Sequence, residues 1–369
     1  MYDVRALLAD PLLAGPLAES LDGAPPRYLR SVKIKLTARC NLKCTMCRYG
    51  RGERPPELPT ERWLAVIDEL AAMGCRKMHL SGGEVMVRKD LEALVARGRE
   101  RRLKVTLTSN LTLLDKARAK ALMRLRPSGI STSLDGARAK THDRIRGIEG
   151  SFKRTVSGLA LLQRHRRHLQ PRIRVNFVML RDNYAEYPEV VRLAAELGAV
   201  DVVPMPVDSK RRSIRLNKRL IRDYNERVAP EVAAARAAAG MRLDAGRVYP
   251  FGRDKEAVNA ASLGHYAAGY YEEHLCFAPY LHMFVAWDGD VFLCCMTNGR
   301  IEPLGNLGQQ GVREVFTGAR FQAIRAAMRE RRLDSCHACD MMLDDNRELE
   351  TALSPESPLL ARRRLPLIA

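Results

Sequence analysis

Three cysteines lie close together near the start of the chain, in the stretch TARCNLKCTMC at residues 37–47. Cys40, Cys44 and Cys47 follow a strand-like stretch, and the residues between them are mostly hydrophilic, which predicts accessible thiols. A structural zinc site uses four protein ligands. Three thiolates around an iron–sulfur cubane instead leave one iron open for another ligand. The triplet therefore predicts a metal cluster with one open position.

The elements that must position these thiols follow from an alternation of strand-like and helix-like stretches over residues 31–240. Strands are expected at 32–38, 76–82, 104–110, 129–136, 172–180 and 199–207, with helices between them and one helix opening at Thr60. Six such units predict an α/β fold with parallel strands and right-handed crossovers, a partial (β/α)6 TIM barrel. Function in such folds lies at the carboxyl ends of the strands.

The pattern changes near residue 270. Two short stretches around Asp288-Gly289 predict a β-hairpin, and a helical stretch follows it. This part of the chain is therefore expected to form a second, smaller module.

Composition restricts the class of protein. The chain has 369 residues, 46% hydrophobic residues and a formal net charge of +19. Its arginines are spread along helices without interleaved aromatic residues, which indicates a solvated surface and no nucleic-acid partner. No apolar run reaches the roughly 18 residues of a membrane helix, and no signal peptide is evident. We expect a cytoplasmic protein without a membrane partner, whose cysteines bind metal or stay free thiols.

The C-x₃-C-x₂-C loop after the first strand, with SGGE at 81–84 after the second, resembles the radical S-adenosylmethionine (SAM) superfamily. The resemblance implies a [4Fe–4S] cluster on Cys40, Cys44 and Cys47 whose open iron binds the amino and carboxylate groups of SAM. An electron from the cluster then releases a 5′-deoxyadenosyl radical. An external electron donor such as flavodoxin or ferredoxin is implied as a partner.

The resemblance also implies which residues contact SAM. The candidates are Met46, Gly82, Gly83, Glu84, Asn110, Ser133, Asp135 and Arg146. The GGE segment would meet the ammonium group of SAM, because glycine allows close approach and a carboxylate suits a cation. SLDG at 133–136, followed by HDRIRG at 142–147 and GSF at 150–152, resembles a further pattern of the family. In it Ser133 resembles the ribose contact and Arg146 the partner of the SAM carboxylate. The alternative is that Asp135 is a turn aspartate and that Arg144 and Arg146 are surface arginines. Met46 stands where the family usually has an aromatic residue against adenine.

The second cysteine set resembles the auxiliary-cluster module of SPASM and twitch radical SAM enzymes. Its expected ligands are Cys276, Cys294, Cys336 and Cys339. They would close a second [4Fe–4S] cluster, with a structural zinc site as the alternative. No cysteine follows Cys339, which favours the short twitch form, and a closed cluster is expected to transfer electrons.

Four regions are expected: an N-terminal extension at 1–30, the radical SAM barrel at 31–250, the twitch module at 270–345 and a C-terminal extension at 346–369.

Three reactions are compatible with this layout: alcohol oxidation, epimerisation and peptide modification. An epimerase needs a thiol facing the substrate, yet residues 76–275 contain no cysteine. Cys75 is expected to be a buried structural thiol, and Cys295 to be a spare ligand, a core residue or a hydrogen donor. The roughly 30 residues before the barrel leave little room for a peptide-binding domain. A non-enzymatic iron–sulfur scaffold or a zinc-stabilised nucleic-acid binder would not explain GGE and SLDG.

The cysteine layout most resembles the dehydrogenases and epimerases of aminocyclitol and aminoglycoside antibiotic biosynthesis, with 2-deoxy-scyllo-inosamine dehydrogenase as the best analogue. We therefore expect oxidation of a secondary alcohol of an aminocyclitol, aminoglycoside or sugar-like metabolite to a ketone, with the second cluster as electron acceptor. Asp208, Arg174 and His79 are the candidate substrate contacts or catalytic residues.

Overall fold

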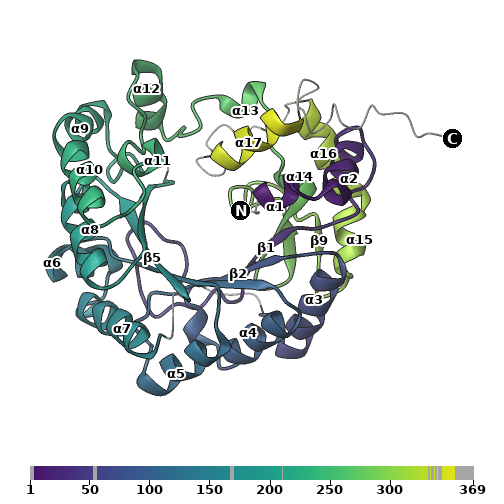
Figure 1. Cartoon of the computed structure of the whole chain (residues 1–369), viewed down its shortest axis with the longest axis horizontal. Coiled ribbons are helices and arrows are strands. Elements are labelled where there is room, and N and C mark those ends of the chain that lie inside the picture. Colours follow the sequence, from purple (N-terminus) through teal and green to yellow (C-terminus); the bar gives the residue numbers. More distant parts are fainter. Residues whose placement is uncertain are drawn as a thin grey trace.

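The computed structural model describes residues 4–52, 56–166, 170–209, 211–330, 333, 336, 339 and 343–353. Within this part of the chain, one sheet has the strand order β6-β5-β4-β3-β2-β1-β7-β8-β9. Its strands are β1 Ser31–Lys35, β2 Lys77–Ser81, β3 Lys104–Thr108, β4 Gly129–Ser133, β5 Arg172–Met179, β6 Asp201–Pro206, β7 His282–Val285, β8 Asp290–Phe292 and β9 Gly305–Asn306. Figure 1 shows this sheet curved into an open barrel with a ring of helices around its outer face.

Strands β1 to β6 are parallel and follow each other in sequence order, so the expected α/β fold with a parallel sheet is confirmed. Burial alternates along them as the sequence pattern predicts. In β1, Val32 and Ile34 are buried among the residues of the outer helices, whereas Lys33 and Lys35 are partly exposed on the inner face. Period-two alternation separates the two faces because successive side chains of a strand point to opposite sides.

The helices that connect the strands cover the outer face. They are α3 Thr60–Ala72, α4 Leu91–Glu100, α5 Lys116–Leu125, α6 Ala139–Arg146, α7 Ser151–His165, α8 Tyr187–Glu196, α9 Lys218–Asp223, α10 Ala229–Ala238, α11 Ala245–Val248 and α12 Lys255–Leu263, with short turns at η1 Val85–Val87, η2 Tyr184–Glu186 and η3 Tyr224–Val228. Helix α3 buries Trp63, Ile67 and Leu70 on one face, at the spacing that the sequence predicts.

The C-terminal part continues the sheet of the barrel. Strand β7 pairs in parallel with β1, and β8 returns antiparallel to β7 through the expected hairpin. Gly289 supplies the positive φ of +92° in that turn. The second, smaller module expected from the sequence thus shares a sheet with the barrel: all residues of β7 are buried, and β7 covers the edge of β1 whose backbone groups would otherwise stay unpaired. Helices α13 Tyr270–Glu273, α14 Ala278–Leu281, α15 Val312–Thr317, α16 Ala319–Arg329 and α17 Leu343–Leu353 complete this part.

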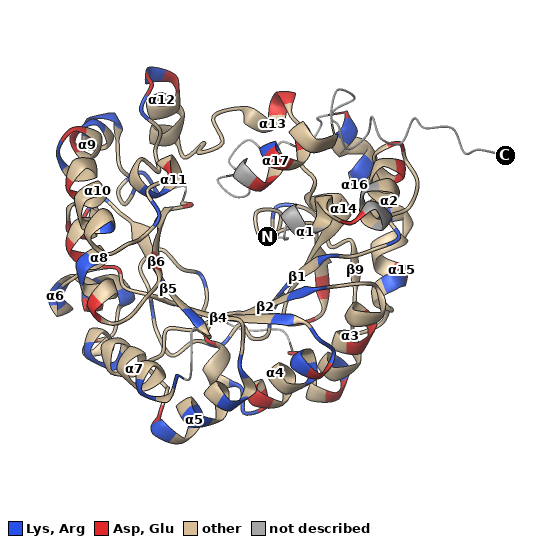
Figure 2. Cartoon of the chain, viewed as in Figure 1, with Lys and Arg blue, Asp and Glu red and all other residues tan. Residues whose placement is uncertain are grey.

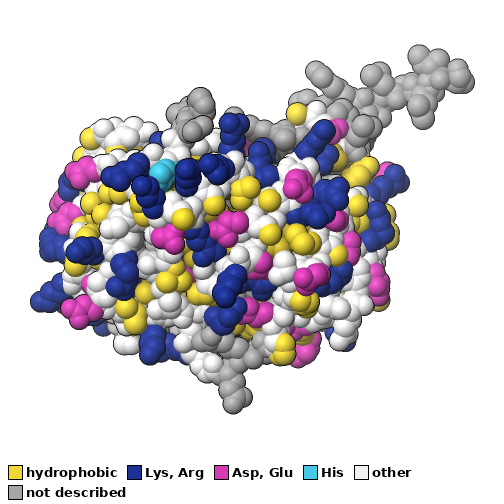
Figure 3. All heavy atoms as spheres, turned by 90° about the horizontal axis from the view of Figure 1, so that it is seen from below, with side chains coloured by type: hydrophobic (Ala, Val, Ile, Leu, Met, Phe, Trp, Pro, Cys, Tyr) yellow, Lys and Arg dark blue, Asp and Glu magenta, His cyan; other side chains and the backbone are white. Residues whose placement is uncertain are grey.

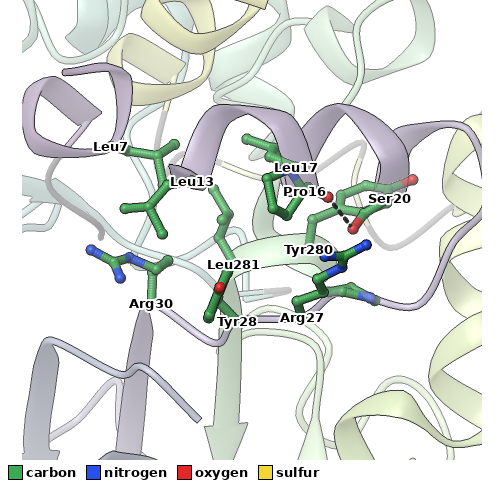
Figure 4. A pocket seen from close by; sticks show the side chains of 11 residues that line it. Leu7, Leu13, Pro16, Leu17, Ser20, Arg27, Tyr28, Arg30, Tyr280 and Leu281 are labelled. Atoms are coloured by element: carbon green, nitrogen blue, oxygen red, sulfur yellow. Dashed lines mark hydrogen bonds between the residues drawn. The ribbon is translucent and has the colours of Figure 1, made fainter. Parts of the chain in front are cut away.

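Helices α1 Val4–Leu8 and α2 Pro11–Leu21 pack on the C-terminal part. Their apolar side chains share a small buried cluster with residues of α14 and α17: Val4, Leu7, Leu17, Phe277, Tyr280, Leu281 and Leu349. Figure 4 shows Leu7, Leu13 and Leu17 lining a pocket with Leu281 and the start of β1. The two expected terminal extensions stay predictions, and the C-terminal one lies outside the described residues beyond 353. Within the described chain, no helix has the length and hydropathy of a membrane span.

Candidate active site

The loop between β1 and α3 carries the first three cysteines. Cys44 is buried, and Cys40 and Cys47 are partly exposed. The backbone N–H of Leu42 donates to Cys40 Sγ at 3.4 Å, and that of Tyr49 donates to Cys47 Sγ at 3.4 Å. Such N–H donors favour the charged form of an acceptor sulfur, which is the form that binds metal.

These three thiols fit an iron–sulfur cluster. Burial, opposed by the Leu42 N–H and aided by the nearby charges of Glu84, Cys44 and Cys47, raises the pKa of Cys40 to about 11, so the thiols lie near one another. All nine cysteines lie in the described chain, and no two of them form a disulfide. Among the described residues, no three Cys, His, Asp or Glu side chains converge on a single-ion site. Each thiolate of a cubane binds a different iron, and three neighbouring thiols in one loop fit such a cluster.

The GGE segment after β2 lies backbone to backbone against the cysteine loop. The N–H of Gly83 donates to Thr37 O at 2.8 Å, and the N–H of Glu84 donates to Arg39 O at 2.9 Å. A Cβ at Gly82 would lie 2.6 Å from Thr37 O, and one at Gly83 would collide with Arg39 O. The close approach of the neighbouring loop therefore requires glycine at both positions, independently of any contact with SAM.

Glu84 and Asn110 join the ends of β2 and β3 to the cysteine loop. The buried carboxylate of Glu84 accepts hydrogen bonds from Ser109 Oγ at 2.7 Å and from the backbone N–H of Asn110 at 2.6 Å and Met86 at 2.9 Å. Burial raises the pKa of Glu84, and these donors lower it. Asn110 Nδ2 donates to Asn41 Oδ1 at 2.9 Å, inside the cysteine loop. Their contacts with SAM stay predictions.

Asp135 and Arg146 form a buried ion pair behind Cys44. Arg146 Nη2 lies 2.7 Å from Asp135 Oδ2, and Arg146 Nη1 donates to Cys44 Sγ at 3.7 Å. Asp135 Oδ1 accepts the backbone N–H of Val178 at 2.9 Å. The structure thus engages Arg146 with a carboxylate and a thiol, and its contact with the SAM carboxylate stays a prediction.

The HDRIRG and GSF segments meet through a residue that the sequence analysis did not single out. Asp143 accepts hydrogen bonds of 2.7 Å from the backbone N–H groups of Gly150 and Phe152 and from Ser151 Oγ. These donors lie at the start of α7, where N–H groups have no partner within the helix. Asp143 therefore fixes α7 against α6. The signal in the sequence is the aspartate seven residues before GSF. It was missed because it binds the start of a helix and is not among the expected cofactor contacts.

Met46 and Ser133 lie at the expected end of the sheet. Met46 packs against a small apolar cluster that contains Ile145, Leu180 and Val207. Ser133 ends β4, is partly exposed, and stands in register with Asn176 of β5. A flexible apolar side chain and a hydroxyl suit the adenine and ribose of SAM, and both contacts stay predictions.

The second cysteine set lies around β7 and β8. Cys276, Cys294 and Cys339 are buried, and Cys336 is partly exposed. Burial raises the pKa of Cys276, and the nearby charges of Cys336 and Cys294 raise it further, so these three thiols are neighbours. The N–H of Cys339 donates to the carbonyl of Cys336 at 3.0 Å, which folds the C-x₂-C pair into one turn. Four thiolates in an apolar setting fit a closed [4Fe–4S] cluster.

The three candidate catalytic residues have different surroundings. His79 Nδ1 lies 2.8 Å from Thr106 Oγ1, and its Nε2 lies 3.1 Å from Thr108 Oγ1, on the inner face. Burial lowers the pKa of His79 well below its usual value, so the ring is neutral. Arg174 lies on the inner face of β5. Asp208 is exposed and pairs with Arg300 Nη2 at 3.0 Å, which links the end of β6 to the C-terminal part.

Lys35 is a site residue that the sequence analysis missed. Burial, aided by the charge of Lys33, lowers the pKa of Lys35 to about 7, while the charges of Cys295 and Cys47 act in the opposite direction. Its Nζ lies 5.2 Å from the centroid of the Tyr49 ring. Lys35 therefore stands between the first cysteine loop and the residue next to Cys294. The alternation VKIK was the signal, since it places both lysines on the inner face.

Further contacts join the cysteine loop to the C-terminal part. The rings of Tyr49 and Trp287 meet edge to face at 5.8 Å between centroids. Arg48 Nη2 donates to the carbonyl of Asn298 at 3.4 Å. The two cysteine sets are thus held on the same side of the sheet by direct packing.

Two family models match the chain. The radical SAM superfamily model covers residues 34–194, and the SPASM model, an iron–sulfur cluster-binding domain, covers residues 276–340. The chain carries a radical SAM domain and a SPASM domain. The cofactors of this pair of domains are SAM and two [4Fe–4S] clusters. The short twitch form of the second domain stays a prediction.

Relatives of several activities share parts of this chain. An AdoMet-dependent heme synthase of Methanosarcina barkeri is 38% identical over 46% of this chain and 48% of its own length. A PqqA peptide cyclase of Gluconobacter oxydans is 33% identical over 58% of this chain and 60% of its own length. The chain thus spans less than two thirds of either relative. Streptococcus suis SuiB bound to precursor peptide SuiA shares the fold, with a TM-score of 0.63 and 17% identity over 85% of this chain and 71% of that chain.

Proposed function

We propose that this radical SAM enzyme is a dehydrogenase that oxidises a secondary alcohol to a ketone, with the SPASM cluster as electron acceptor. The observation that carries the proposal is the position of Lys35, whose charge interacts with both Cys47 and Cys295. A substrate beside Lys35 would lie between the two cysteine sets. When bound, SAM and the first cluster supply a 5′-deoxyadenosyl radical, and the second cluster supplies an acceptor for one electron.

The site residues would have the following roles in this reaction. Cys40, Cys44 and Cys47 would hold the first cluster, and Cys276, Cys294, Cys336 and Cys339 the second. His79 and Arg174 lie on the inner face and would contact oxygen atoms of the substrate. Neutral His79 is already hydrogen-bonded at both ring nitrogens, so its role would be positioning. Asp208 pairs with Arg300 and would instead hold the two parts of the chain together.

The substrate class that the sequence favours is an aminocyclitol, aminoglycoside or sugar-like metabolite of antibiotic biosynthesis. Modification of a peptide is supported about as well as alcohol oxidation. Its support comes from relatives that are PqqA peptide cyclases and from the fold shared with SuiB bound to its precursor peptide. Reduction of the first cluster would need an external donor such as flavodoxin or ferredoxin. The reaction, the substrate class and the donor are each open to a direct test.

The test of the electron acceptor compares cysteine variants of the anaerobically reconstituted enzyme. Cys336→Ala is expected to keep dithionite-dependent SAM cleavage, to lose about half of the iron and to form no ketone. Cys40→Ala is expected to lose SAM cleavage. Cys75→Ala is the matched control, because Cys75 is a buried thiol whose sulfur contacts the carbonyls of Arg30 and Lys77. Normal ketone formation by Cys336→Ala would contradict the acceptor role.

A second candidate function, epimerisation, is favoured by one observation. Cys295 interacts with Lys35 on the inner side of the sheet, so its thiol is placed where a hydrogen donor would act. An epimerase would incorporate solvent deuterium at the inverted carbon and lose that incorporation in Cys295→Ala. The dehydrogenase proposal expects ketone formation by Cys295→Ala at a rate similar to that of the wild type.

A further inference from the structure

The inner face of the sheet carries a group of basic side chains. They lie on three strands, in positions that alternate with the buried outer-face residues: Lys33, Lys35, Lys77, Arg172 and Arg174. Strand register places Lys33 beside His79, and Arg172 and Arg174 beside Gly129 and Ser131 of β4. Figure 2 shows Lys and Arg positions, in blue, along strands of the curved sheet. We call the five residues the inner basic face.

Several basic residues on the outside of the molecule have acidic partners. Arg118 pairs with Glu92 at 2.6 Å, and Arg138 pairs with Glu189 at 3.0 Å. Figure 3 shows an outer surface on which Lys and Arg are interspersed with Asp and Glu. These outer arginines are compensated where they stand.

Three members of the inner basic face lack such compensation. Within the described chain, no ion pair involves Lys33, Lys35 or Arg172. The charges that act on His79 from neighbouring strands are those of lysines, including Lys33 and Lys35. The carboxylate that acts on Arg174 is that of Asp201.

Asp201 is already occupied by other partners. Its Oδ1 lies 2.6 Å from Arg236 Nη2, and its Oδ2 lies 3.1 Å from Arg247 Nε. Both oxygens are therefore taken by arginines of the helical layer. Like charges held together in a partly enclosed site raise the free energy of the folded state, and an anionic ligand removes that cost.

The location of the inner basic face connects it with the reaction. Lys35 lies between the two cysteine sets, and Lys33, one inner-face position before it, lies further from the cysteine loop. One cation near the first cluster would suffice to balance thiolate charge. The additional cations on β1 and β5 would be balanced by a different anion. They lie toward the amino ends of their strands, so a substrate bound at the carboxyl ends would reach them by extending into the barrel.

We propose that the inner basic face binds the substrate through acidic groups, so that the substrate is a small molecule with at least two carboxylate or phosphate groups. This inference rests on the proposed function and narrows its substrate class. Among sugar-like metabolites it selects sugar acids and sugar phosphates. Aminocyclitols are cations and would be repelled by the inner basic face.

Calorimetric titration of the reconstituted holoenzyme with SAM tests this inference without turnover. The probes are citrate, fructose 1,6-bisphosphate, glucose and 2-deoxystreptamine. Citrate or the bisphosphate is expected to bind, more weakly as ionic strength rises, while neutral glucose and the diamine do not bind. The stronger of the two anions distinguishes a carboxylate from a phosphate substrate. Tighter binding of 2-deoxystreptamine than of both anions would overturn the inference, as would tight binding of a glutamate-rich peptide with no binding of either anion.

Variants localise the binding. Lys33→Met and Arg174→Met are each expected to weaken binding of the anion about fivefold, the loss of one charge–charge contact in a partly screened site. Lys33→Arg is expected to retain the wild-type affinity. Arg138→Met is the matched control, because it removes a cation from the outer face. Equal weakening by Arg138→Met would overturn the inference. If the wild-type holoenzyme binds the anion but does not cleave SAM, that result would contradict the proposed function and leave this inference standing.

Discussion

The buried pair of Asp135 and Arg146 allows a quantitative test of how the first cysteine loop is supported. The side chain of Asp135 is 0% exposed and that of Arg146 is 10% exposed, and their closest atoms are 2.7 Å apart. Arg146→Met leaves the carboxylate of Asp135 buried without its cation. The carboxylate keeps the hydrogen bond from the backbone N–H of Val178. Breaking a buried pair by removing one partner costs about 3–5 kcal/mol of unfolding free energy. The same variant removes the N–H group that reaches Cys44.

The assay is anaerobic urea unfolding of the reconstituted enzyme, followed by circular dichroism and by the iron content of the folded fraction. The single variant Arg146→Met is expected to lose about 3–5 kcal/mol. The double variant with Asp135→Asn is expected to recover much of that loss, because the introduced amide is neutral and can still accept the Val178 N–H. A loss below about 1 kcal/mol, or a double variant no more stable than the single one, would refute the reasoning.

The deficit of Arg146→Met should also depend on pH. Burial raises the pKa of Asp135, and Arg146 opposes that rise. The pKa is already raised in the wild type and rises further without Arg146, so the folded variant binds more protons than the folded wild type and gains more stability as the pH falls. The deficit is therefore expected to shrink between pH 7 and pH 5. A deficit that grows over this range relative to wild type would contradict the assignment.

Three other variants, one of them with a matched control, test the site. Gly83→Ala would drive a Cβ into Arg39 O, so it is expected to lose about 1–3 kcal/mol and SAM affinity, measured by unfolding and by SAM titration. Gly246→Ala, with its closest neighbour at 3.5 Å, should change neither quantity. Asp143→Ala should lose about 1–2 kcal/mol at neutral pH. Burial acts to raise the pKa of Asp143, but the helix-start donors outweigh it and leave the pKa lowered, so this contribution should be lost as the pH falls through the folded-state pKa. If the stability difference between Asp143→Ala and the wild type stayed undiminished at low pH, that result would count against this role of Asp143. Cys75→Ala should retain the full iron content, and a loss of iron would reveal an unrecognised ligand.

The parallel strands could be predicted from sequence because their outer faces are apolar and their inner faces are polar. The same alternation could not predict that β7 pairs with β1, since the pairing joins segments about 250 residues apart. A period-two pattern specifies a face but no partner. The hairpin was therefore predicted correctly, while its union with the barrel sheet was not.

The candidate site was predicted through motifs and missed where no motif exists. Glu84 and Asn110 were found as strand ends, and the structure joins them by a hydrogen bond of 2.6 Å. Lys35 was missed because its importance depends on Cys47 and Cys295, which approach it only in the folded chain. A charge without an acidic partner cannot be recognised until all neighbours are known.

The central claim is that the chain holds two clusters, one open to SAM and one closed by four thiolates. It is tested most directly by iron and sulfide analysis of the reconstituted protein, with SAM cleavage measured under dithionite. The account predicts about eight irons and eight sulfides per chain, with formation of 5′-deoxyadenosine. About four irons per chain with cleavage intact would contradict the second cluster and remove the proposed electron acceptor.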